Sequence, residues 1–281
     1  MANVLWPFEN LTMWTTLMLN PLLTVALGLS HAPRMVAAIL IGMLAACTGH
    51  AVAALPAPCR EATVEGKSFS ICTFDLRTTT LNLHWKDEHG EPYGNVGTLA
   101  RSLGRHGGPV AMALNAGMYH ADGSPVGLYV ENGQQLIKAN TAGGPGNFHM
   151  KPNGVFYFSA DDAGVLETGT FLKTKPKAEF ATQSGPMLVI DGRLHPKFSA
   201  DGPSLKIRNG VGVRDSRTVI FAISNEAVSF GDFGRLFRDT LKCPNALFLD
   251  GSISSLWAPS VNRADESWPA GPIVSATTRA R

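Results

Sequence analysis

The chain has 281 residues, of which 44% are hydrophobic and 16% are charged, and it contains 29 glycines and 18 prolines. Its net charge is only +2 and no run of Lys or Arg is interleaved with aromatic residues, which argues against nucleic acid or an acidic membrane surface as a partner. Abundant Gly and Pro at low charge predict short strands joined by many turns.

The first 54 residues differ in composition from the rest and are interpreted as a targeting segment. An uncharged run from Leu11 to Ser30 is followed by Arg34, a second apolar run from Met35 to Ala46, and small residues that lead to Leu55. A basic residue, an apolar stretch and an A-x-A site in that order predict a cleaved secretory signal, with the mature protein beginning near Leu55. The expected location is therefore the periplasm or cell envelope.

Two other interpretations of this segment remain open. Leu44 to Cys47 resembles the lipobox of bacterial lipoproteins, which would make Cys47 a lipidated terminus. The run from Leu11 to Ser30 could instead be a retained membrane anchor, although Asn20-Pro21 in its middle weakens that interpretation. Three methionines offer alternative starts: Met13, Met18 and Met35.

Three cysteines follow the leader. Glu65-Gly66 falls midway between Cys59 and Cys72, and a two-residue hairpin loop there would set the two cysteines opposite each other. In an exported protein this register predicts a disulfide, which would contribute about 3 kcal/mol of stability. The alternative is two unrelated buried thiols. Cys243 is expected to be a buried thiol that follows a helix.

Periodicity predicts the elements of one domain over residues 55–281. Strands are expected at 68–76, 80–85, 126–131, 154–159, 187–190, 218–224 and 246–249, with a further apolar run at 109–114. Ile71, Phe74, Leu81 and Leu83 are expected in the core. Helices are expected at 95–106 and at 229–241, the second with Ser229 as its N-cap.

These elements predict an α+β fold of layered mixed β-sheets with flanking helices in a single domain. Regular βα alternation is missing from the pattern, which argues against a Rossmann fold or a TIM barrel. Continuous apolar runs such as 218–224 are typical of strands buried on both faces. No phosphate-loop, zinc-protease, C-x-x-C or G-x-S-x-G motif occurs, and no group of residues has metal-ligand spacing, so no metal or cofactor is predicted.

Polar, glycine-rich segments at the ends of apolar runs are the candidate binding elements, because binding sites form at such loops. They are 115–120, 146–149, 183–186, 208–212 and 249–255. Their amides, hydroxyls and guanidinium suit a hydroxyl-rich anionic ligand. Each also has a structural alternative: a turn at Asn115-Ala116-Gly117, a loop cap at Asn147 and His149, a surface ion pair for Arg208, and a plain turn at Asp250-Gly251.

Taken in order, five segments resemble the phosphodiester glycosidase domain of bacterial envelope proteins, a family related to the animal N-acetylglucosamine-1-phosphodiester alpha-N-acetylglucosaminidase. The resemblance runs from about Cys59 to Val274. The segments are NAGMYHADGSPVGLYVENG (115–133), GNFHMKPNGVFY (146–157), ATQSGPMLVIDG (181–192), IRNGVGV (207–213) and NALFLDGSISSL (245–256). The chain departs from the animal pattern after Asp250, where Gly251 is followed by Ser252-Ile253 rather than by further glycines.

The resemblance implies hydrolysis of the bond between an anomeric carbon and a phosphate oxygen, with Asp250, Arg208 and Asn115 as the catalytic residues. Arg208 would hold the phosphate bidentately, and Asp250 would face the anomeric carbon or orient a water molecule. Asp122 and Glu131 remain open as further acids or bases. Substrate contacts are expected from Gly117, His120, Asn147, His149, Gln183, Ser184, Asn209, Ser252, Ser254 and Ser255.

Two functions therefore follow from the sequence. The first is an exported hydrolase that acts on a phosphorylated glycan or another sugar phosphodiester. The second is an envelope protein that binds such a glycan with the same pocket and does not cleave it. Under either function Asp250, Arg208 and Asn115 are expected to meet in one cleft, and membrane contact would come only from an uncleaved leader or a lipidated Cys47.

Overall fold

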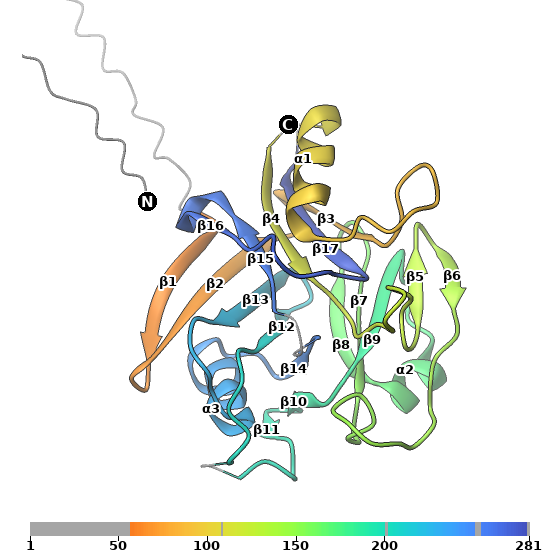
Figure 1. Ribbon diagram of the computed structural model, residues 1–281. Helices are drawn as coiled ribbons and strands as arrows, with labels where there is room; N and C mark the ends of the chain where they lie inside the picture. Colours follow the sequence, from red (N-terminus) through yellow and green to blue (C-terminus); the bar gives the residue numbers. More distant parts are fainter. Residues whose placement is uncertain (1–56, 108, 200–201, 251–253, 280–281) are drawn as a thin grey trace, which may run out of the picture. The chain divides into compact units, whose positions relative to one another are not determined.

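The computed structural model describes residues 57–107, 109–199, 202–250 and 254–279 (Figure 1). The predictions for the leader, including lipidation of Cys47, and the binding role of Ser252 lie outside these residues. No helix within the described residues is long and apolar enough to cross a membrane.

The strands of the described residues form three sheets. The first has the order β1 (Cys59–Val64), β2 (Lys67–Asp75), β13 (Thr218–Ser224), β12 (Asn209–Asp215), β14 (Asn245–Phe248), β10 (Met187–Ile190) and β11 (Arg193–Leu194). The second has the order β16 (Arg263–Ala264), β15 (Leu256–Ala258), β4 (Val110–Asn115), β17 (Ile273–Thr278) and β3 (Thr79–His84). The third has the order β6 (Gln134–Ile137), β5 (Tyr129–Glu131), β9 (Phe180–Ser184), β7 (Gly154–Phe158) and β8 (Ala163–Glu167).

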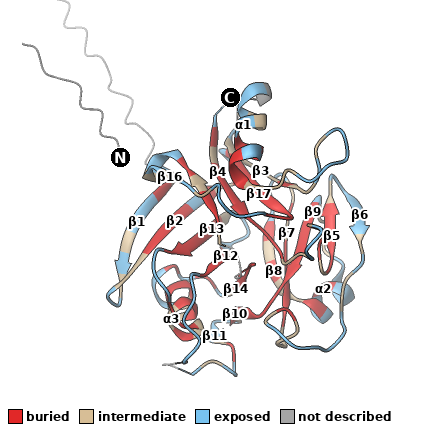
Figure 2. Cartoon of the chain, viewed as in Figure 1, coloured by how far each residue is buried: buried red, intermediate tan, exposed pale blue. Residues whose placement is uncertain are grey.

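Side chains from all three sheets meet in one core, which includes Leu83, Leu114, Phe156 and Phe221. Figure 2 shows buried residues, in red, along the strands of these sheets. The other face of each sheet packs against a helix. These helices are α3 (Phe230–Arg235) with the π-helix η1 (Leu236–Thr240) on the first sheet, α1 (Val96–Gly107) on the second, and α2 (Thr168–Thr174) on the third. A short 3₁₀ helix, η2 (Pro259–Val261), follows β15. The predicted combination of layered sheets and flanking helices is confirmed.

The prediction of mixed sheets is wrong, because every strand pairing among the described residues is antiparallel. The long apolar runs are nevertheless buried on both faces. In β13, Val219, Phe221 and Ile223 enter the common core, whereas Ile220 and Ala222 face α3 and η1. A sheet covered on both sides needs two apolar faces whatever the direction of its strands, so apolar runs do not by themselves indicate parallel pairing.

The predicted hairpin and disulfide are confirmed. β1 and β2 pair with Cys59 opposite Cys72 and Val64 opposite Lys67, which leaves Glu65-Gly66 as a two-residue loop. Both loop residues have positive φ, as a type I′ turn requires. The Cys59–Cys72 disulfide is present, and Cys243 is a free, buried thiol as expected.

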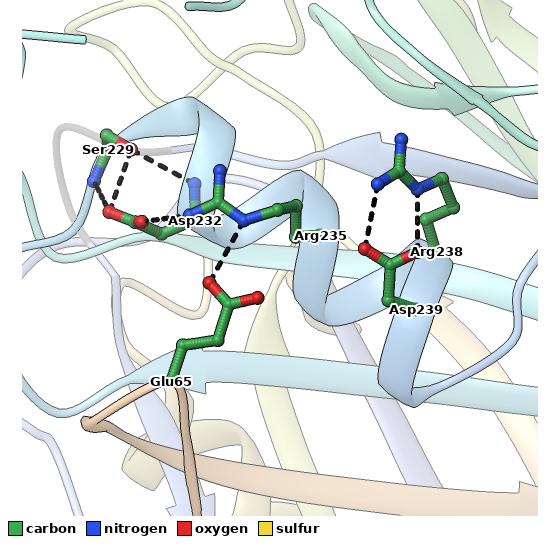
Figure 3. Close-up of polar contacts among 6 residues, drawn as sticks. All are labelled: Glu65, Ser229, Asp232, Arg235, Arg238 and Asp239. Carbon is green, nitrogen blue, oxygen red and sulfur yellow. Dashed lines mark hydrogen bonds and ion pairs between the residues drawn. The ribbon is translucent and has the colours of Figure 1, made fainter. Parts of the chain in front are cut away.

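The two predicted helices form, the second with the predicted Ser229 cap. Asn95 Oδ1 accepts a hydrogen bond from Thr98 N at 2.8 Å at the start of α1. Ser229 and Asp232 form a reciprocal capping box at the start of α3 (Figure 3). In the same view Arg235 binds Glu65 of the β1–β2 loop and Asp232, and so connects α3 to the hairpin. The predicted helix 229–241 continues as the π-helix η1, in which Leu241 N donates to Leu236 O.

Two predicted segments differ in the structure. In the glycine-rich segment 208–212, predicted as a loop, residues 209–212 form the start of β12. A Cβ at Gly212 would lie 2.7 Å from Cys243 Sγ and from Phe237 Cδ1, so the glycine allows η1 and the following Cys243 to pack on the strand. The strand predicted at 126–131 is shorter, since β5 begins at Tyr129.

Candidate active site

Ends of strands from all three sheets meet around Asn115, the last residue of β4. Its backbone N–H binds Ser255 O ahead of β15, and Asp250 N, after β14, donates to Ala116 O at 3.0 Å. On the other side a Cβ at Gly117 would lie 2.6 Å from Gln183 O in β9, so Gly117 lets this loop approach the third sheet. The structure thus brings together residues that are far apart in the sequence.

The Asn115 side chain holds this junction together. Its Nδ2 donates to Asp250 O at 3.1 Å, and its Oδ1 accepts from Ser255 N at 2.8 Å and from Asn209 Nδ2 at 2.9 Å. Asn115, Asn209 and Ser255 are fully buried. Since both ends of the Asn115 amide bind neighbouring segments, Asn115 positions the Asp250 backbone.

Three buried polar atoms at this junction have no hydrogen-bond partner among the described residues: Ser184 Oγ, Asn209 Oδ1 and Ser255 Oγ. Buried polar groups without a partner are uncommon, because their desolvation is uncompensated. They mark the junction as a place where a ligand hydroxyl or a water molecule would be stabilised.

Asp250 lines an open cleft of about 510 Å³ together with Tyr119, His120, Asp122 and Pro269. The Tyr119 hydroxyl donates to Pro269 O at 2.6 Å and lies close enough to the Asp250 carboxylate for the two groups to interact. Burial and then the Asp250 charge raise the pKa of Tyr119 far above its usual range. The hydroxyl therefore stays protonated and serves as a hydrogen-bond donor in the cleft.

The second carboxylate in this cleft is Asp122. Its Oδ1 accepts hydrogen bonds from Ser124 Oγ at 2.6 Å and from Ser124 N at 2.9 Å, and these bonds lower the pKa of Asp122. Asp122 is thus held ionised beside the exposed His120. Glu131, the other carboxylate considered as an acid or base, lies outside the cleft. It accepts a hydrogen bond from the Tyr129 hydroxyl at 2.7 Å, and burial raises the pKa of Glu131. The described residues contain no group of His, Cys, Asp or Glu that could hold a metal ion.

Arg208 is buried beside this junction and does not line the cleft that contains Asp250. Backbone carbonyls and an aromatic ring surround its guanidinium. Its Nε donates to Val228 O at 2.9 Å, its Nη2 donates to Ser204 O at 2.7 Å, and its guanidinium stacks 3.6 Å from the centre of the Phe230 ring. Burial lowers the pKa of Arg208 to about 10, and the carboxylate whose charge opposes this shift is Asp232. The backbones of Arg208 and Asp250 nevertheless adjoin, because Leu249 N donates to Asn209 O.

Three other predicted contact residues hold loops in the structure. Gln183 Oε1 accepts from Leu128 N and Asn140 N, and its Nε2 donates to Asn140 O. His149 Nδ1 lies 3.0 Å from Ala142 O, and Asn147 O accepts from Met150 N in a turn. None of the three lines the cleft that contains Asp250.

Ser254 does not line the cleft of Asp250 and instead lines a second hollow with Arg263 and Trp268. The sequence interpretation did not select Arg263, Trp268 or Tyr119. Tyr119 could have been found from its place in the segment 115–120. Arg263 and Trp268 follow η2 in a segment without a regular apolar pattern, and only the folded chain brings them beside Ser254.

Comparison with known proteins shows clear relatives. The sequence profile of the phosphodiester glycosidase family matches residues 108–275. The uncharacterized protein YigE of Escherichia coli is 38% identical over 185 residues, which cover 66% of this chain and 72% of YigE.

Two solved structures share the fold at low sequence identity. The catalytic domain of zebrafish N-acetylglucosamine-1-phosphodiester alpha-N-acetylglucosaminidase is 13% identical with a TM-score of 0.53, over 79% of this chain and 82% of that domain. A hypothetical protein from Synechocystis is 14% identical with a TM-score of 0.52. The alignment covers 79% of this chain and 61% of the Synechocystis protein.

Proposed function

Since this chain belongs to the phosphodiester glycosidase family, we propose that it hydrolyses the bond between the anomeric carbon of a sugar and a phosphate oxygen. The observation that carries this proposal is the buried Asp250 carboxylate, which lines an open cleft beside a protonated Tyr119 hydroxyl. The zebrafish protein that shares the fold is named for cleavage of N-acetylglucosamine from such a phosphodiester, which supports the same bond type here.

In the proposed reaction the bond between C1 and the phosphate oxygen breaks, and its electron pair leaves with that oxygen. A water oxygen forms the new bond to C1, and Asp250 accepts the proton that this water loses. The Asp250 charge also stabilises the positive charge that develops on the sugar ring. Because the second pKa of a phosphomonoester is about 6, the leaving group needs little protonation at neutral pH. One base and a hydrogen-bond donor are therefore sufficient.

We assign the remaining residues around this step according to their contacts. Asn115 and Asn209 position the Asp250 backbone, and Ser255 belongs to the same buried network. Arg208 is buried and does not line the cleft, so it is assigned to supply positive charge next to the Asp250 backbone. His120 and Asp122 lie at the open part of the cleft, where a leaving phosphomonoester would exit.

The test is turnover of a panel of sugar-1-phosphodiesters by the wild-type protein and by Asp250→Asn. The amide keeps the shape of the side chain and removes its charge and basicity, so kcat is expected to fall at least about a hundredfold with binding largely retained. A protein whose melting temperature rises with these compounds, but which releases no sugar, would be a glycan-binding protein and would refute the hydrolase.

We also propose that the protein acts in the periplasm or cell envelope, which the Cys59–Cys72 disulfide and the leader pattern support. Mass spectrometry of envelope-purified protein is expected to find an N-terminus near Leu55 or a lipidated Cys47. A cytoplasmic protein with an intact first 34 residues would contradict export.

A further inference from the structure

A groove of about 420 Å³ lies beside the candidate active site and has no role in the proposed chemistry. Its lining includes Ile207, Asn225, Ser254, Arg263, Asp265 and Trp268. Trp268 lines this groove and the next residue, Pro269, lines the cleft of Asp250 and accepts the Tyr119 hydrogen bond. The two hollows therefore share one short stretch of chain.

The polar groups of the groove are held in fixed positions. Arg263 Nε donates to Asp265 Oδ2 at 2.7 Å and its Nη1 donates to Asn225 Oδ1 at 2.7 Å. Asp265 Oδ2 also accepts from Leu256 N at 3.0 Å. Within the described residues, Arg263 Nη2 and Asp265 Oδ1 form no hydrogen bond, and both side chains are partly exposed. A rigid donor and a rigid acceptor are thus available side by side, and a sugar hydroxyl can bind both.

The apolar part of the groove is an exposed indole. Trp268 is 60% exposed, the largest value among the large hydrophobic side chains described, and Ile207 in the same groove is also exposed. The face of an aromatic ring carries negative partial charge and attracts the slightly positive C–H groups on the face of a pyranose ring. A sugar is a ligand that has both an apolar C–H face and hydroxyl groups around its edge.

The charges of the groove favour a neutral ligand over a phosphate. Arg263 is paired with Asp265, and the further carboxylate in the lining, Glu266, is paired with Arg101 at 2.7 Å. With its cation already neutralised and Glu266 nearby, the groove offers no excess positive charge to an anion.

We propose that this groove binds a neutral sugar residue, which stacks on Trp268 and shares its hydroxyls with Arg263, Asp265 and Ser254. Because the groove adjoins the Asp250 cleft, the sugar belongs to the same glycan as the phosphodiester. The substrate is then an oligosaccharide phosphodiester rather than a single sugar phosphate. The identity of the substrate as an oligosaccharide phosphodiester rests on the proposed function, whereas binding of a neutral sugar in the groove does not.

The experiment measures binding of cellotetraose, chitotetraose and maltotetraose to the full protein by calorimetry. At least one is expected to bind the wild type, Trp268→Ala to weaken that binding at least about tenfold, and Trp268→Phe to retain most of it. Leu136→Ala is the matched control, since Leu136 is another exposed hydrophobic residue, 47% exposed, outside the groove. Failure of all three probes to bind, or equal binding by Trp268→Ala, would overturn the proposal.

Two further measurements separate this proposal from others. Asp250→Asn is expected to bind the neutral probe as the wild type does. Absence of turnover in the wild type would count against the hydrolase and not against the groove. If turnover is found, Trp268→Ala is expected to raise KM for an oligosaccharide phosphodiester and leave KM for a monosaccharide phosphodiester unchanged. If Trp268→Ala instead abolishes self-association in sedimentation and the probes do not compete, the groove is a protein contact and the sugar proposal is refuted.

Discussion

The contacts of Arg208 are structural, and the role proposed for it in substrate binding would be a second use of the same side chain. Two of its nitrogen atoms bind the carbonyls of Val228 and Ser204, and Phe230 packs against its flat face. Stacking and two directional bonds fix the plane of the guanidinium, which the flexible ammonium of Lys cannot reproduce.

Arg208→Lys is therefore expected to lower the melting temperature and to raise KM more than it lowers kcat. Arg214→Lys is a matched control, because Arg214 Nε also donates to a backbone carbonyl, that of Leu241 at 3.0 Å, away from the cleft. A purely structural Arg208 would give a lower melting temperature with KM unchanged, which steady-state kinetics on the intact fraction would detect.

Tyr119 is expected to orient the Asp250 carboxylate through its hydroxyl, which stays protonated because its pKa is raised. Tyr119→Phe removes this donor and leaves the ring in place, so kcat is expected to fall about tenfold or more with little change in melting temperature. Tyr157→Phe in β7 serves as the control. Unchanged kcat in Tyr119→Phe would show that the hydroxyl serves only Pro269 O.

At the scale of elements, β12 shows why some glycines signal packing and not loops. Gly212 is buried in a strand, with Phe237 of η1 and Cys243 so close that a methyl group does not fit. Where two elements approach this closely, only glycine leaves room for the contact. In the sequence, such a glycine cannot be distinguished from a glycine in a turn.

Gly212→Ala is therefore expected to destabilise the protein by about 1–3 kcal/mol through overpacking. Gly104→Ala in α1 is the matched control, because a Cβ there meets nothing within 4 Å and alanine favours a helix by up to about 1 kcal/mol. Urea unfolding of both variants should show opposite signs. A neutral Gly212→Ala would mean that Phe237 and Cys243 can move aside.

At the scale of the whole molecule, stability is expected to depend on pH through His84 in β3. Burial lowers the pKa of His84 to about 4, below its ordinary value of about 6.5, and its Nε2 lies 2.9 Å from Ser275 Oγ. The folded state therefore excludes a proton that the unfolded state binds. The His84 contribution is complete above about pH 6.5 and is lost as the pH falls towards 4, by about 2 kcal/mol at pH 5.

Urea unfolding at pH 7.5 and at pH 5 checks this expectation. His84→Gln should lose less stability between the two values than the wild type, whereas His89→Gln, at an exposed position, should behave like the wild type. Equal losses in the wild type and His84→Gln would assign the acid sensitivity to other groups.

The sequence by itself determined the features that depend on near neighbours in the chain. The period-2 pattern of β2 and β3, the Glu65-Gly66 turn and the Ser229 cap each involve residues a few positions apart. Local geometry was therefore enough to predict the hairpin, its disulfide and the helices α1 and α3, but not the short helix α2. The order of five polar segments was enough for the family, as the family profile over residues 108–275 confirms.

Only the tertiary structure decided which polar residues share a site. Asn115 ends β4, Asn209 begins β12 and Asp250 follows β14, so the three residues come from two sheets. Their contact depends on how those sheets pack around the common core. Packing also placed Arg208 against Phe230, turned Gln183 towards loop backbone, and brought Trp268 beside Ser254. These outcomes depend on contacts between residues distant in the chain, which the spacing of a single sequence does not encode.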